Sequence, residues 1–266
     1  MRSALFVLFA RLGDVCCGIP TFRALAKKYP EAKLYWLTLP KYFELVPEFG
    51  VPVSIPSPEP FGRPPDLTAA FDLVYHAQPM WRHEEWKASG KHVIDLIASW
   101  CDVSLADRKI QVDVPVAVVE RVARMPLPNR FLTIGCSPTI SSRNLLPEHF
   151  PSIVEFCRLN KIPYAAVGGD DGVSIPGAID FRGHLSPVES IALINRSAVY
   201  VGPDSGTSWL ACAAQNPKKV CVLDRERMKD GMVGFQGFAD GAITDVFYQD
   251  GLNALIGAVE NAWRAE

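Results

Sequence analysis

The sequence has little of what marks several classes of protein. Its 27 Lys and Arg residues are balanced by 29 Asp and Glu residues, so there is no excess of positive charge for binding nucleic acid. No apolar run reaches the ~18 residues that a membrane-spanning helix needs. The seven cysteines are odd in number and form no C-x-x-C pair, which disfavours structural zinc and a disulfide framework. We therefore expect a cytoplasmic chain with reduced thiols, no nucleic-acid partner and no transmembrane segment.

Several ligand-binding motifs are also missing. The sequence contains neither the G-x-G-x-x-G fingerprint of dinucleotide-binding domains nor the G-x-x-x-x-G-K-[ST] loop that cradles nucleotide phosphates. It has no H-E-x-x-H pair and no D-x-D motif of the kind that holds a metal-bound diphosphate. We expect neither a metal ion nor a cofactor.

The composition is that of a globular chain, with 48% hydrophobic and 21% charged residues in 266 positions, enough for two domains. The run ALFVLFA at 4–10 predicts a strand buried on both faces, and no small-residue cleavage site follows it as a signal peptide would require. Further strands are expected at 33–39, 71–77, 131–136, 163–169, 178–183, 198–202 and 219–224, and helices at 15–29, 89–101, 147–160, 187–196 and 251–264. The proline-rich stretch 51–65 is expected to be a loop.

This alternation of strands and helices restarts once, near the middle of the chain. It predicts an α/β protein with two Rossmann-like domains that face each other across a cleft. We expect an N-terminal domain at 1–126 and a C-terminal domain at 127–250. A C-terminal helix over 251–266 follows, for which packing back on the first domain is one arrangement.

The most informative turn is in YVGPDSGTSW, which runs from a strand into a helix. The start of such a helix offers backbone amides and a dipole that favour an anion, and a phosphate or diphosphate is the natural guest. The candidate donor-binding residues here are Asp204, Ser205, Gly206, Thr207 and Ser208. The alternative is that Asp204 or Ser205 simply caps the helix.

Other turns at strand ends carry further candidates. In RLGD, Asp14 is either a general base or a helix cap. In the loop after 131–136, phosphate or sugar oxygens could be bound by Ser137, Thr139, Arg143 and Asn144, unless the loop is only solvated. Gly169 and Asp170 could meet a ribose or form a surface turn, and Trp81 and Arg82 suit an acceptor sugar.

Two segments together resemble glycosyltransferase family 9, the bacterial heptosyltransferases of lipopolysaccharide assembly. They are RLGDVCCGIPTFRALAKKYPEAKLYWLT and FRGHLSPVESIALINRSAVYVGPDSGTSWLACAA. The resemblance implies a GT-B fold and an inverting, metal-independent transfer from a nucleoside-diphosphate sugar, heptose being one candidate, to a glycan or glycolipid hydroxyl. It implies that Asp14 deprotonates the acceptor, with Arg11 and Gly13 beside it, and that Asp204, Ser205 and Gly206 hold the diphosphate. It is compatible with peripheral association with a membrane.

The sequence departs from the family pattern at two places. Trp209 stands where the family usually has His, and Asn144 stands where Lys is expected. Two other functions therefore stay open: a non-catalytic nucleotide- or sugar-binding member of the same fold, and a nucleotide-sugar epimerase of GT-B fold.

Overall fold

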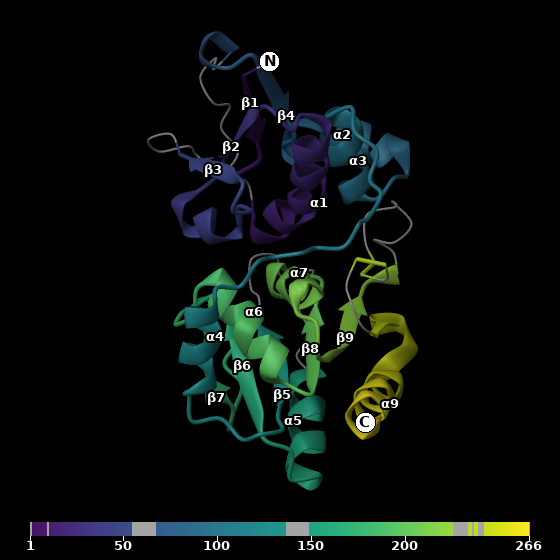
Figure 1. Cartoon of the computed structure of the whole chain (residues 1–266). Helices are drawn as coiled ribbons and strands as arrows, with labels where there is room; N and C mark the ends of the chain where they lie inside the picture. The colour runs from purple at the N-terminus through teal and green to yellow at the C-terminus, as the bar shows by residue number, and fades with distance from the viewer. Residues whose placement is uncertain are drawn as a thin grey trace. The chain divides into compact units, whose positions relative to one another are not determined.

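The structure is a computed structural model in which residues 2–9, 11–54, 68–136, 149–225, 234–235, 237–238 and 242–265 are described (Figure 1). The chain divides into two compact units, Met1–Asp113 with Asp230–Met232, and Val114–Lys229 with Val233–Glu266. Each unit is built on its own parallel sheet.

The first unit contains a four-stranded sheet in the order β3-β2-β1-β4. Its strands are β1 (Ser3–Val7), β2 (Lys33–Leu37), β3 (Gly50–Val53) and β4 (Leu73–His76). Its helices are α1 (Leu12–Lys28), α2 (His83–Ser89) and α3 (Val93–Trp100), with the 3-10 turns η1 (Pro40–Leu45), η2 (Thr68–Ala70) and η3 (Pro79–Arg82).

Helix α1 packs closely on the first sheet because Gly18 faces it. A Cβ at Gly18 would come within 2.3 Å of Leu8 Cδ2. Beside it, the Trp36 ring lies edge-on to Phe6 at 4.9 Å and packs on Phe22 at 4.9 Å, and the Trp36 indole nitrogen donates to the Leu8 carbonyl at 2.8 Å. These contacts fix the middle of α1 against β1 and β2.

The second unit contains a six-stranded sheet in the order β10-β9-β8-β5-β6-β7. Its strands are β5 (Leu132–Cys136), β6 (Tyr164–Gly168), β7 (Ile179–Asp180), β8 (Val199–Pro203), β9 (Lys218–Leu223) and β10 (Ile243–Phe247). Its helices are α4 (Val116–Ala123), α5 (His149–Leu159), α6 (Pro187–Arg196), α7 (Gly206–Ala213) and α9 (Gly251–Arg264), with η5 (Tyr248–Asp250) before the last.

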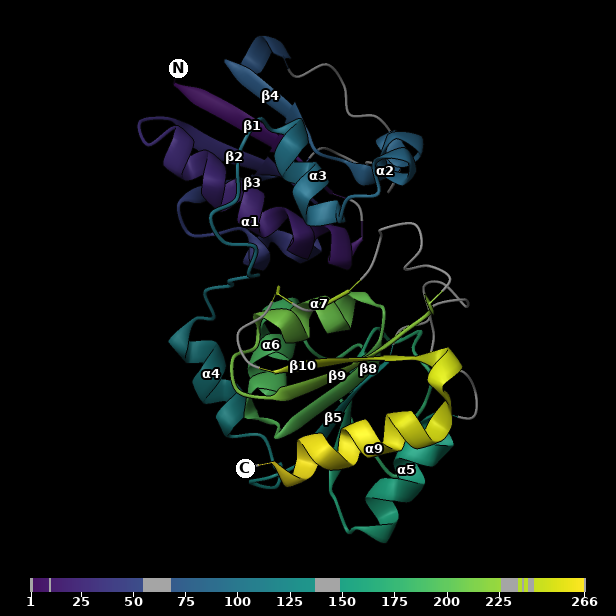
Figure 2. The ribbon, with the colours of Figure 1, turned by 90° about the vertical axis from the view of Figure 1, so that its right-hand side faces the viewer.

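Helices cover both faces of this second sheet, α5 and α9 on one side and α6 and α7 on the other (Figure 2). Alternate residues of the strands divide between the two faces, as the pleat requires. Leu132, Val201 and Val220 join the core beneath α5 and α9. Tyr200, one position from Val201, instead bonds Ser208 of α7.

The observed boundary between the units differs from the one expected from sequence. It falls at 113/114 and not at 126/127, because α4 packs against α6 of the second unit and the Arg121 guanidinium bonds the Glu189 carboxylate at 2.7 Å. The C-terminal helix α9 packs on β8, β9, β10 and α5 of its own unit, where the sequence left open that it packs on the first domain.

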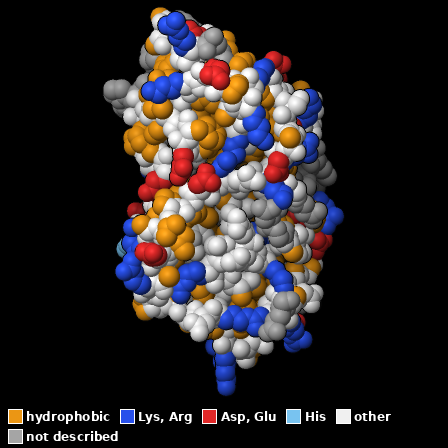
Figure 3. All heavy atoms as spheres, in the orientation of Figure 1, with side chains coloured by type: hydrophobic (Ala, Val, Ile, Leu, Met, Phe, Trp, Pro, Cys, Tyr) orange, Lys and Arg blue, Asp and Glu red, His pale blue; other side chains and the backbone are white. Residues whose placement is uncertain are grey.

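None of the helices in the described part of the chain has both the length and the apolar character needed to cross a membrane. On the face shown in Figure 3, basic and acidic side chains are interspersed with scattered apolar ones. This mixture matches the near balance of charge in the sequence.

Candidate functional site

Each of the two sheets reverses its strand order at one point. In the second unit the chain runs outward from β5 through β6 to β7, then returns to β8 on the other side of β5. In the first unit it runs from β1 to β3 and returns to β4 on the other side of β1. In open parallel sheets, ligands bind at the carboxyl ends of the strands at such switch points.

The turn after β8 leads directly into α7. Ser205 is the N-cap residue, with φ −150° and ψ 168°, yet its side chain makes no capping bond and its hydroxyl lies 2.7 Å from the Thr207 hydroxyl. The amides of Ser208 and Trp209 donate to the Ser205 carbonyl at 3.1 and 3.2 Å. The Gly206 and Thr207 amides precede these bonds, at the positive end of the helix dipole. Capping by Ser205, one of the alternatives left open, is therefore not what the structure has.

A network of buried hydroxyl groups stabilises this turn on its protein-facing side. The Tyr200 hydroxyl lies 3.0 Å from Ser208 Oγ, which donates to the Pro203 carbonyl at 2.5 Å. Tyr200 is completely buried, and burial raises the pKa of its phenol. A Cβ at Gly135 would lie 2.1 Å from that hydroxyl. Ser208, predicted to touch the donor, thus bonds inside the protein and stabilises the turn.

Trp209 follows in the first turn of α7 and is only 6% exposed. Its ring packs on Phe235 at 4.5 Å and on Phe238 at 6.0 Å between centroids. The indole is therefore part of an aromatic cluster with these two phenylalanines.

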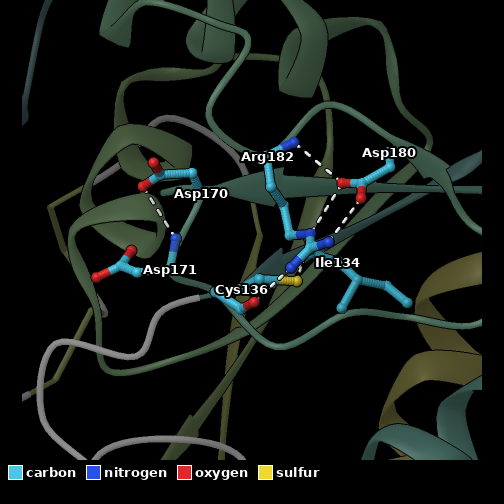
Figure 4. Close-up of polar contacts among 7 residues, drawn as sticks. Ile134, Cys136, Asp170, Asp171, Asp180 and Arg182 are labelled. Atoms are coloured by element: carbon cyan, nitrogen blue, oxygen red, sulfur yellow. Dashed lines mark hydrogen bonds and ion pairs between the residues drawn. The ribbon is translucent and has the colours of Figure 1, made fainter.

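The loops after β6 and β7 lie at the same carboxyl edge (Figure 4). Gly169 and Asp170 are exposed there, and Asp170 Oδ1 accepts the Asp171 amide at 2.9 Å. Arg182 forms a two-bond ion pair with Asp180, and these bonds hold the pKa of the Asp180 carboxyl below its usual value.

In the first unit, Asp14 is the third residue of α1 and half-buried. Its Oδ2 accepts the Arg11 amide at 3.3 Å, so Asp14 supports the helix N-terminus from the third position, while the N-cap residue itself is Arg11. Nearby, burial, with Cys16 and Asp14 adding to it, raises the pKa of Tyr42 to about 12.

The exit of β4 is tied to the segment that enters α1. Gln78 is completely buried, and its Oε1 accepts the Phe9 amide at 3.2 Å. The Trp81 ring lies edge-on to Phe9 at 5.8 Å, so the structure brings Trp81 close to the α1 entrance. The Arg82 guanidinium instead lies 5.1 Å from the Trp100 ring and 3.8 Å from the Glu85 carboxylate.

The remaining candidates fall outside the described residues: Ser137, Thr139, Arg143 and Asn144. Sequence reasoning missed three residues that hold strand ends and turns within their own units: Gln78 in the first, and Tyr200 and Arg182 in the second. In the sequence, Tyr200 looks like any other residue of an apolar strand. No local sequence pattern distinguishes Gln78 or Arg182. In the described part of the chain, no group of three or more His, Cys, Asp or Glu side chains is placed to hold a metal ion.

No protein-family model matches the sequence, and no curated protein matches it. Solved structures do match it along its whole length. The structure of a family 9 glycosyl transferase from Veillonella parvula DSM 2008 aligns with TM-score 0.72 and 13% identity, covering 100% of this chain and 98% of that one. The fold is that of the GT-B glycosyltransferases.

Two further structures carry the same fold. The E. coli ADP-heptose LPS heptosyltransferase II aligns with TM-score 0.66 and 10% identity, covering 99% of this chain and 98% of that one. The iron-containing dodecameric heptosyltransferase TibC, in complex with ADP-D-beta-D-heptose, aligns with TM-score 0.64 and 15% identity, covering 91% of this chain and 62% of that one. The predicted α/β class with two Rossmann-like domains is confirmed, and family 9 is represented among the matching structures.

Proposed function

We propose that this GT-B protein is a glycosyltransferase that moves a sugar from a nucleoside-diphosphate sugar to a hydroxyl acceptor. The observation that carries the proposal is the turn 203–206, which opens α7 at the switch point of the second sheet without a capping bond from Ser205. Backbone amides at that position are suited to a diphosphate. Support comes from the matching structures, since two are heptosyltransferases named with ADP-heptose.

In the proposed reaction, Asp14 takes the proton from the acceptor hydroxyl. The alkoxide oxygen forms a bond to the anomeric carbon, and the bond from that carbon to the diphosphate breaks. The leaving diphosphate carries the electron pair to the N-terminus of α7, where a well-placed donor is worth ~3–4 kcal/mol in the transition state. A direct displacement of this kind inverts the anomeric configuration.

The donor-side residues divide into two groups in this proposal. Asp204, Ser205, Gly206 and Thr207 form the diphosphate turn, with Gly169 and Asp170 toward the nucleoside. The segment that carries Ser137, Thr139, Arg143 and Asn144 follows β5, the strand next to β8, and would complete the phosphate site. On the acceptor side we place Arg11, Gly13 and Trp81, with Arg82 held by Glu85.

We also propose that the transfer needs no metal ion. The diphosphate charge would be balanced by helix amides and basic side chains of the chain itself. Because TibC is named as iron-containing, this point needs its own test. Activity that survives dialysis against EDTA supports it, and activity restored only by an added metal ion overturns it.

The finer identity follows the matching heptosyltransferases. We propose heptose as the sugar, a lipopolysaccharide-type glycan as the acceptor, and the cytoplasm, with peripheral association with a membrane, as the location. We test this by incubating the protein with ADP-heptose and a heptose-deficient lipopolysaccharide core. Proton NMR of the product then reports the anomeric configuration.

Transfer with inversion is the expected result. Conversion of the donor to an epimer without acceptor would replace the proposal by an epimerase. Binding of the nucleotide with no turnover of any donor would replace it by a binding protein.

A further inference from the structure

Arg182, just after β7, is engaged on three sides by its own unit. Its Nε and Nη2 donate to the two carboxylate oxygens of Asp180 at 2.8 and 2.6 Å, and its Nη1 donates to the Gly172 carbonyl. Figure 4 shows the guanidinium lying between Asp180 and the end of β5. The side chain is 13% exposed, so its charge is directed into the protein and away from solvent.

These bonds join two loops that touch backbone to backbone. The Gly183 amide donates to the Gly168 carbonyl at 2.9 Å. Gly183 has φ +70°, and a Cβ there would lie 2.7 Å from Asp170 Cβ. A Cβ at Gly168 would lie 1.9 Å from the Cys136 carbonyl oxygen. The loop 169–172 therefore lies close to Cys136 at the end of β5, through Gly172, and to Gly183 after β7, through Asp170.

The chemistry of the pair requires arginine. A planar guanidinium can bond both carboxylate oxygens and still offer a third donor to a carbonyl, whereas a lysine ammonium cannot hold this fork. The Asp180 carboxylate compensates the charge of the Arg182 guanidinium. Arg182 can therefore bond the Gly172 carbonyl without leaving an unpaired charge in the protein.

We propose that Arg182 and Asp180 are positioning residues that hold loop 169–172 in place for the nucleoside part of the donor. This inference rests on the proposed function, because it assigns the loop to the same nucleotide. Arg182 acts through Gly172 and the loop, since its Nε, Nη1 and Nη2 each already donate a hydrogen bond within the protein. The diphosphate, bound at α7, does not depend on the pair.

The test compares Arg182→Lys and Asp180→Asn with the wild type in calorimetric titrations. The probes are inorganic pyrophosphate and the tightest-binding of ADP, UDP, GDP and CDP. Arg158→Lys is the matched control, because Arg158 makes the same two-bond pair with Glu155, at 2.8 and 2.6 Å, on α5. Melting temperatures are recorded for every variant.

We expect Arg182→Lys and Asp180→Asn each to lower nucleotide affinity about tenfold, because the loop that binds the nucleoside is no longer held in position. Their affinity for pyrophosphate should be unchanged. The control should bind both probes as the wild type does. If a folded Arg182→Lys or Asp180→Asn variant keeps its nucleotide affinity, or loses affinity for both probes equally, this inference is wrong but the proposed function stands. If the wild type binds none of the nucleotides, the proposed function itself fails.

Discussion

Asp14 is the residue on which the proposed chemistry depends, and an amide substitution tests it. Asp14→Asn keeps an acceptor for the Arg11 amide but cannot take a proton. We expect transfer to fall by at least about a hundredfold, the usual scale of a general base, while nucleotide affinity stays the same. Initial rates of product formation and nucleotide titrations measure both.

Asp95→Asn is the control for this substitution, because Asp95 also lies in the first turn of a helix, α3. It should retain wild-type turnover. Equal turnover by the Asp14 and Asp95 variants would remove Asp14 from the mechanism.

Asp245, on β10, gives a second test at the residue scale, through the pH dependence of stability. Burial raises its pKa from 3.8 to about 6, although the Phe235 amide donates to it. Between these two values the folded protein keeps a proton that the unfolded chain loses, so stability falls as pH rises through this window. We expect Asp245→Asn to raise the melting temperature by about 2–6 °C at pH 8 and hardly at all at pH 4.

The prediction is checked by melting curves across that pH range. A variant whose melting temperature differs from the wild type by the same amount at pH 4 and pH 8 would show that Asp245 does not titrate as described.

At the scale of elements, the seating of α7 on β5 and β8 is the feature that positions the diphosphate turn. Gly135→Ala would place a methyl group 2.1 Å from the Tyr200 hydroxyl and 3.0 Å from Thr207 Oγ1. Overpacking of this kind costs about 1–3 kcal/mol, so we expect a lower melting temperature and weaker pyrophosphate binding together.

Gly257→Ala in α9 is the matched control, because a Cβ there meets no atom within 4 Å. It should be neutral or stabilising, since alanine favours a helix more than glycine does. Loss of stability in Gly135→Ala without any loss of pyrophosphate binding would separate the hydroxyl network from the anion site.

Some strands could be predicted from the sequence and others could not. Buried runs such as β1 and β8 were predictable, because a parallel strand covered on both faces is uniformly apolar. β3 was taken for loop because of Pro52, yet proline is tolerated in an edge strand, and β3 pairs only with β2. β10, the opposite edge of the larger sheet, was missed as well.

The candidate site was predictable where local spacing carries it, as in the two strand-turn-helix segments that hold Asp14 and Ser205. Tyr200, Gln78 and Arg182 could not be found in this way. Each acts through a partner brought close by folding: Ser208, the Phe9 amide and Asp180 respectively. Contacts of this kind are set by the register of the sheets.

At the scale of the whole molecule, the second unit has a core of its own. Its buried cluster is drawn entirely from residues between Leu132 and Trp263. We expect the fragment 114–266 to fold alone, with one cooperative melting transition, and to keep the nucleotide affinity of the full chain within about threefold. Circular dichroism and titration measure these, and a fragment without a cooperative transition would contradict the division into units.

The central claim is that the N-terminus of α7 binds the diphosphate of a nucleotide, and one thermal-shift titration tests it most directly. ADP, UDP, GDP and CDP are added to the wild type, to Gly206→Asp and to Pro187→Asp. Both substitutions put a carboxylate at the first position of a helix, α7 or α6, which the helix dipole tolerates, but only the first faces the proposed diphosphate.

A nucleotide at a hundred times its dissociation constant adds ~2.7 kcal/mol to stability, a rise of several degrees for a chain of this size. The account predicts this rise for at least one nucleotide with the wild type and Pro187→Asp, and its loss in Gly206→Asp. No rise with any of the four nucleotides, or an equal rise in Gly206→Asp, would contradict the assignment of α7 as the diphosphate site.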